Sequence, residues 1–187
     1  PGENAEFEMN IRQFDGSPLS GNDVALSHTK KIHLLVVDES LTDYQHLHPE
    51  PDSLYDGTWR CSLTPKNAGK YFVFFDFIPT RSPRRVLLTS FFAVEGDRVS
   101  KPPVQEKLLY SSGKRRFELK RDESEEGGQA MKLIFEASDE DGKILALRPV
   151  MGAFAHMVAF DDELKGFAHL HPLENALPAG QEDVHEG

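Results

Sequence analysis

Short hydrophobic runs separated by turn residues recur along the first half of the chain. The runs are rich in β-branched, leucine and aromatic residues, and Gly, Pro, Asn and Asp stand between them at intervals that are typical of a β-sandwich. No segment predicts a convincing helix. The pattern predicts strands at Phe7–Gln13, Lys31–Val37, Asp43–His48, Thr58–Leu63, Gly69–Phe77 and Val86–Val94.

An internal repeat is visible in the same hydrophobic pattern. The segment from His33 to Pro49 matches the segment from His156 to Pro172 at a constant offset of 123 residues, without a gap. Six of the eight histidines fall at equivalent places, so chance is a poor explanation. The identical pairs are His33/His156, Asp38/Asp161, Leu41/Leu164, His46/His169, Leu47/Leu170, His48/His171 and Pro49/Pro172.

The repeat predicts an all-β protein with two immunoglobulin-like β-sandwich units in tandem. The first unit covers residues 1–97, and its stretch Leu63–Tyr71 resembles the turn and aromatic-led strand common in immunoglobulin-like domains. Residues 98–113 have linker composition, with local strand pairing of Leu108-Leu109-Tyr110 as an alternative, and residues 114–187 form the second unit. At the same offset its last strands would lie beyond the end of the chain, so we expect an incomplete second sandwich. Truncation or omitted residues come first as explanations, and strands supplied by another chain come next.

Three histidines of each unit are predicted to converge on one face of a hairpin. Side chains alternate between the two faces of a strand, so His46 and His48 point the same way. If the segment from Asp38 to Leu41 is the hairpin turn, His33 lies opposite or nearly opposite His46, with His48 one diagonal step away. The predicted metal ligands are therefore His33, His46 and His48 in the first unit and His156, His169 and His171 in the second.

The donor set indicates a transition metal. Three neutral imidazoles suit copper, zinc or nickel, whereas Ca²⁺ and Mg²⁺ prefer oxygen ligands. The repeat also suggests a fourth ligand, because the residue five positions before the first histidine is His28 in one unit and Met151 in the other. A methionine thioether favours Cu(I), so copper is the first choice and zinc the alternative. The odd spacing requires a bulge or loop to turn this side chain inward.

Charge and composition narrow the classes of partner. A net charge of −10 argues against nucleic acid or an anionic membrane as the main partner. No apolar run reaches the roughly 20 residues that a membrane span requires. The single cysteine, Cys61, excludes an intramolecular disulfide and a cysteine-cluster metal site. Since the sequence begins at Pro1, we expect that a tag, signal peptide or lipoprotein leader was removed.

The two histidine segments resemble a known group of repeats. Ser27–Val37 followed by His46-Leu47-His48-Pro49, and Pro149–His156 followed by His169-Leu170-His171-Pro172, are similar to the tandem HxHP immunoglobulin-like repeats of secreted bacterial proteins. Such repeats occur near heavy-metal and copper efflux components, and they are broadly similar to YtkA-like and copper-resistance periplasmic folds. The resemblance covers most of the chain.

The resemblance implies an exported β-sandwich protein, periplasmic or secreted and with a lipid anchor before processing as one option. Its partners would be the metal ion and a metal-efflux or acceptor protein. We therefore expect a copper carrier or scavenger of the bacterial envelope that is not an enzyme. Two alternatives stay open: a three-histidine zinc hydrolase or copper redox enzyme, and a structural module whose assembly, for example as a homodimer, is stabilised by metal. A hydrolase also needs a general acid or base nearby, and the repeat supplies only Asp38 and Asp161, at the far end of the predicted hairpins.

Overall fold

The protein is all-β, as the sequence predicts. The computed structural model describes residues 1–53, 56–82, 84–98, 100, 102, 107–121 and 131–173. Within these ranges the regular elements are antiparallel strands and one short 3-10 helix, η1 (Gly21–Asp23). None of the described segments is a helix long and apolar enough to cross a membrane.

The contacts divide the chain into two units at positions that differ from the predicted boundaries. One unit contains residues 1–102 together with residues 149–187, and the other contains residues 103–148. The second histidine segment therefore belongs to the same unit as the first, instead of forming a sandwich of its own.

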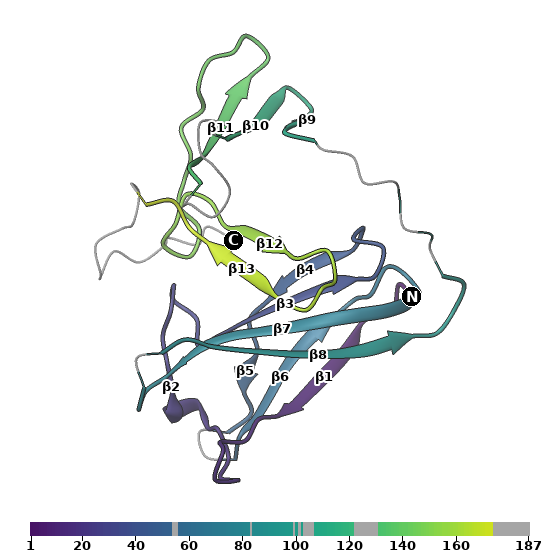
Figure 1. The fold of residues 1–187 in the computed structure, drawn as a ribbon, viewed down its shortest axis with the longest axis vertical. Helices are drawn as coiled ribbons and strands as arrows, with labels where there is room; N and C mark the ends of the chain where they lie inside the picture. Colours follow the sequence, from purple (N-terminus) through teal and green to yellow (C-terminus); the bar gives the residue numbers. More distant parts are fainter. Residues whose placement is uncertain are drawn as a thin grey trace. The chain divides into compact units, whose positions relative to one another are not determined.

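The first part of this larger unit is a sandwich of two antiparallel sheets (Figure 1). Its strands are β1 (Ala5–Asn10), β2 (Val24–Ala25), β3 (Ile32–Asp38), β4 (Tyr44–Leu47), β5 (Glu50–Pro51), β6 (Thr58–Leu63), β7 (Gly69–Pro79) and β8 (Val86–Val94). One sheet has the order β1-β6-β5. The other has the order β4-β3-β7-β8, with β2 also paired to β7. The same orders occur as strands B-E-D and C′-C-F-G in immunoglobulin-like sandwiches. The immunoglobulin-like assignment itself stays a prediction.

The six predicted strands correspond to β1, β3, β4, β6, β7 and β8, with shifts of a few residues at their ends. One shift concerns the site, because β4 ends at Leu47 and leaves His48 just beyond the strand.

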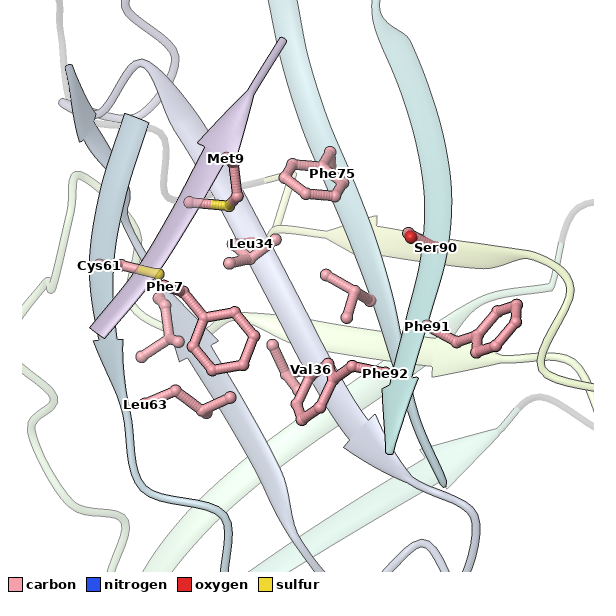
Figure 2. Close-up of a pocket in the computed structure, with 12 residues that line it drawn as sticks. Phe7, Met9, Leu34, Val36, Cys61, Leu63, Phe75, Ser90, Phe91 and Phe92 are labelled. Atoms are coloured by element: carbon pink, nitrogen blue, oxygen red, sulfur yellow. The ribbon is translucent and has the colours of Figure 1, made fainter. Parts of the chain in front are cut away.

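Alternate residues of the strands fill the space between the two sheets. Figure 2 shows Phe7 and Met9 of β1 facing Leu34 of β3, Phe75 of β7 and Phe92 of β8 across an apolar space. The Phe7 and Phe92 rings lie 4.8 Å apart between their centroids. Burial of these side chains supplies the hydrophobic stabilisation of the sandwich.

Cys61 lines the same apolar space (Figure 2). Burial raises the pKa of its thiol to about 11. The cysteine therefore remains a protonated core residue at neutral pH.

A tyrosine at the start of β7 ties two loops of the sandwich together. The Tyr71 hydroxyl accepts a hydrogen bond from the Asn67 backbone N–H at 3.0 Å and donates one to the Asp43 carboxylate at 2.8 Å. Tyr71 and Asp43 are both buried. A tyrosine that bonds back to the backbone just upstream is typical of immunoglobulin-like sandwiches, and it agrees with the prediction for Leu63–Tyr71.

Strand β3 is buried on both faces. Ile32, Leu34 and Val36 belong to the clusters inside the sandwich, while Leu35 and Val37 belong to a separate cluster on the outer face. This explains why both faces of the strand are apolar in sequence.

The outer face of β3 and β7 is covered by a second hairpin, β12 (Met157–Phe160) and β13 (Phe167–Leu170) (Figure 1). Its apolar side chains pack on Leu35, Val37 and Phe74 of the sandwich. A two-stranded hairpin is marginally stable by itself, so it gains stability by burying this face. The cover consists of Val158, Phe160, Leu164 and Phe167.

The smaller unit contains a three-stranded antiparallel sheet with the order β11-β10-β9. Phe117 stands opposite Tyr110 on one side and Ala137 on the other. The last residues of the predicted linker over residues 98–113 pair as an edge strand, which agrees with the local pairing expected at Leu108–Tyr110. The strands are β9 (Leu109–Ser112), β10 (Arg115–Arg121) and β11 (Leu133–Asp139).

Candidate metal centre

The register of the first hairpin sets the relation of its histidines. Strand β3 pairs with β4 so that Leu35 stands opposite His46 and Leu34 opposite Leu47. Continuing this register by one step places His33 beside His48, with His46 on the diagonal. The sequence predicted His33 opposite or nearly opposite His46, with His48 on the diagonal. The register shifts the direct neighbour to His48 and makes His46 the diagonal one.

The connecting loop is the reason for the shift. The Asp38 backbone N–H donates to the Asp43 carbonyl at 3.2 Å, so four residues stand between the paired ends. A shorter turn would have given the predicted register, since loop length sets hairpin pairing.

The second hairpin has the same register as the first. Val158 stands opposite His169, and Met157 stands opposite Leu170. Adding the repeat offset of 123 to both members of each pair in the first hairpin gives these pairs of the second. The two copies of the motif therefore fold into equivalent hairpins, as the repeat predicts.

The repeated aspartates hold the hairpin loops. Asp38 Oδ1 accepts the backbone N–H groups of Thr42 and Asp43, each at 2.9 Å. Asp161 Oδ1 accepts those of Glu163 and Lys165, each at 3.0 Å. Both carboxylates thus serve the backbone at the loop end of each hairpin, a role that accounts for their place in the repeat.

Each hairpin is preceded by a tight turn that carries the predicted fourth ligand. The backbones of Ser27 and Lys30 bond reciprocally, and those of Val150 and Ala153 do the same. His28 and Met151 occupy the first central position of these turns, each with φ of +49°. Positive φ at both central positions is the geometry of a type I′ turn, so a turn accounts for the odd spacing of these residues.

The same turns orient the first histidine of each triad. The Nε2–H of His33 donates to the Ser27 carbonyl at 2.9 Å, and the Nε2–H of His156 donates to the Val150 carbonyl at 2.7 Å. Since a carbonyl only accepts, the neutral ring keeps its lone pair on Nδ1. That Nδ1 atom faces the other histidines in both hairpins: it lies 3.1 Å from His46 Nε2 in the first and 3.0 Å from His171 Nε2 in the second.

Each triad brings three nitrogen atoms together. The ligand atoms of His33, His46 and His48 all lie within 4.8 Å of one another, and the same holds for the second triad. Buried nitrogen atoms of His48 and His169, both Nε2, have no hydrogen-bond partner within the described part of the chain. A buried polar atom without a partner is costly, and a metal ion would satisfy it. The residues present therefore fit a transition-metal ion.

Burial keeps four of the triad histidines, His33, His46, His48 and His171, neutral. It lowers the pKa of His46 and of His171 to about 3, and that of His48 to about 4, and repulsion by neighbouring histidines acts in the same direction. The pKa of His33 is also lowered, mainly by burial. Neutral imidazole is the form that ligates a metal, so the rings are ready to bind at neutral pH.

The two triads lie against each other within the larger unit. The His169 ring is 5.1 Å from the His33 ring and 5.1 Å from the His46 ring, measured between centroids. His28 stacks on His171 at 3.8 Å, whereas its ring is 6.4 Å from that of His33. The structure thus places His28 against the second triad and not among the ligands of its own unit. For Met151 it gives the equivalent turn position, and a ligand role stays a prediction.

Sequence reasoning missed one residue of the site, Asp76. It stands opposite His33 on β7, is 2% exposed, and lies with Oδ2 3.4 Å from His169 Nδ1 and 3.2 Å from Arg85 Nη1. A carboxylate that accepts from one ring nitrogen leaves the other for a metal, and His169 Nε2 is the buried atom without a partner. The available signal was a single charged residue within the hydrophobic run Tyr71–Ile78.

Fold and site together define an all-β protein with two three-histidine clusters that could hold metal ions. The chain belongs to the family described as a domain of unknown function, DUF8832, whose model matches residues 1–93 and 111–185. No curated protein and no solved structure matches the chain. The resemblance to HxHP repeats stays a prediction.

Proposed function

We propose that the protein binds transition-metal ions, with copper as the first choice, and acts as a carrier or scavenger in the bacterial envelope. The observation that carries the proposal is the convergence of three imidazoles, in the same register, in both copies of the repeat. The Nε2 atoms of His48 and His169 support it, because each is a buried nitrogen that could ligate a metal and has no hydrogen-bond partner in the described structure.

The chemistry of the donors favours copper and zinc over the alkaline-earth ions. All six triad ligands are nitrogen atoms, which suit late first-row metals. The position of Met151 beside the second triad in sequence favours copper over zinc there. The net charge of −10 attracts cations in general. The envelope location and the acceptor protein rest on the resemblance to secreted HxHP repeats.

A carrier accounts for the acidic residues better than a hydrolase does. Asp38 and Asp161 accept backbone hydrogen bonds in the hairpin loops, and Asp76 is engaged with His169 and Arg85. A hydrolase would use a carboxylate beside the metal-bound water as a general base. These three carboxylates hold loops or orient a ligand instead.

Metal titration of paired variants tests the proposal. Protein freed of metal is titrated with Cu and, separately, with Zn. We expect His46→Ala with His48→Ala to remove one binding equivalent, and His169→Ala with His171→Ala to remove the other. Leu26→Ala is the control, because this exposed side chain lies next to the turn but outside the triads. Unchanged binding in the first double variant would make the proposal wrong.

Elemental analysis identifies the native metal. Protein purified without an affinity metal should contain copper, and its Cu(II)-loaded form should give the spectrum of nitrogen-ligated copper. Zinc alone at full occupancy would replace copper as the proposed metal while leaving the sites themselves in place.

A further inference from the structure

The rings of the two triads are in direct contact. His169 of the second triad contacts both His33 and His46 of the first, with 5.1 Å between ring centroids in each case. His46 also faces His156 at 6.2 Å. Imidazole rings of one triad are thus neighbours of the rings of the other, with no strand or loop between them.

Residues of the first repeat also complete the surroundings of the second triad. Asp76 on β7 contacts His169 Nδ1, and His28 stacks on His171 with an angle of 25° between the ring planes. The second triad therefore depends on its position against the sandwich. Each hairpin gathers its own three ligands, but the second set obtains its orienting carboxylate from the first repeat.

The apolar contacts of β12–β13 hold the two triads in this arrangement. Leu164, at the loop end of the second hairpin, is buried against Leu35 and Val37, which follow His33 on the same face of β3. On this face of β3, His33 therefore lies at one end, and Leu35 and Val37, which contact Leu164, lie toward the other. Packing of the apolar end places the histidine ends of the two hairpins together.

We propose that the two triads form one dinuclear metal centre, and not two independent sites. The inference rests on the proposed function, because it requires that both triads bind metal. Metal–nitrogen bonds of roughly 2 Å, together with ring separations of 5.1 Å across the triads, put two bound ions within roughly 10 Å of each other. Two paramagnetic ions at this separation interact magnetically.

Electron paramagnetic resonance of the full chain during Cu(II) titration tests the proposal. At two equivalents we expect spin coupling, seen as a half-field transition with dipolar broadening or as loss of signal intensity. Two variants, His46→Ala with His48→Ala and His169→Ala with His171→Ala, are the matched controls. Each should bind one Cu(II) and give an uncoupled signal of full intensity.

Three results would decide against the dinuclear centre or against metal binding altogether. A two-equivalent spectrum equal to the sum of the two variant spectra would show isolated ions and overturn the proposal. Saturation of the wild-type chain at one Cu(II), while each variant still binds one, would overturn it as well. Absence of copper binding to the wild-type chain would instead overturn the proposed function. A wild-type spectrum that keeps its shape and doubles in intensity between one and two equivalents would also show isolated ions, so the test holds even if a variant fails to fold.

Discussion

At the scale of the residue, the site is prepared by partners outside the triads. A backbone carbonyl fixes the tautomer of His33 and of His156, and a carboxylate faces the far side of His169. Such partners orient the ring and raise its basicity toward a metal. His33 and His156 therefore present Nδ1, and His169 presents Nε2, before any ion arrives.

Asp76→Asn should weaken the second metal site. The amide keeps the shape of the side chain but removes the negative charge that favours a proton on His169 Nδ1. Loss of an outer partner of this kind lowers metal affinity by about 10- to 100-fold. Competition titration with Cu(II) in the variant that lacks His46 and His48 measures this site alone.

The same substitution in the variant that lacks His169 and His171 is the control. There the affinity of the first site should change much less, because the Asp76 carboxylate is within hydrogen-bond distance of His169 and, within the described part of the chain, of no ligand of the first triad. An equal loss in both backgrounds would show that Asp76 acts on the fold in general.

Tyr71→Phe should destabilise the sandwich. The substitution removes the hydroxyl that joins Asn67 to Asp43 and leaves the buried Asp43 carboxylate with one partner fewer. The free energy of unfolding should fall by about 1–3 kcal/mol. Urea denaturation measures the change, and Tyr110→Phe is the control, since Tyr110 is 63% exposed in the smaller unit. Equal stability of the two variants would contradict this role.

At the scale of the element, one sequence motif forms two hairpins with different neighbours. Both copies have the same register, the same entry turn and the same aspartate-held loop. The first is part of the sandwich, whereas the second packs on its outer face. The repeated leucine of the loop shows the difference, because Leu164 is 7% exposed and Leu41 is 46% exposed.

Leu164→Ala should loosen the second hairpin, and Leu41→Ala is its matched control. Both residues have positive φ, so the backbone effect of alanine is shared and only the lost burial differs. Leu-to-Ala changes in a core cost about 2–5 kcal/mol. Hydrogen exchange of the β12 and β13 amides should accelerate in the first variant and stay unchanged in the second. Equal exchange in both would mean that Leu164 does not hold the hairpin.

At the scale of the whole molecule, the buried histidines link stability to pH. The pKa values of His46, His48 and His171 are lowered in the folded protein. In the unfolded chain these histidines take up protons near pH 6.5, whereas in the folded protein they do so only near pH 3 to 4. The unfolded state thus binds more protons between these values. The histidine contribution to stability is present above pH 6.5 and is lost as pH falls toward 4.

Denaturation of the metal-free protein at a series of pH values checks this linkage. The free energy of unfolding should decrease on going from about pH 7.5 to about pH 4.5. A variant with Gln at positions 46, 48 and 171 should have a flatter profile, because it lacks the three titrating groups. A wild-type profile as flat as that of the variant would contradict neutral burial of the rings. Bound copper should be released where the protein unfolds at low pH, because the protonated histidines of the unfolded chain cannot ligate it.

The sequence by itself determined the local features of this protein. The alternation of side chains predicted the strands, and the repeat at a fixed offset predicted two equivalent hairpins, each with three converging histidines. These features depend on neighbours along the chain or across one hairpin. Whether His46 or His48 stands directly beside His33 depends on the length of the hairpin loop, and the alternation of side chains leaves that length open.

Only the tertiary structure decided how the two motifs meet. Packing of Leu164 and its neighbours on β3 placed the second hairpin in the same unit as the first, where sequence reasoning expected a separate sandwich. The same packing brought Asp76 to His169 and His28 to His171, pairs that lie far apart in the chain. The hydrophobic effect is non-directional, so the hydrophobic pattern shows only that the apolar face of the second hairpin must be buried. Complementary packing with β3 and β7 decides which surface buries it.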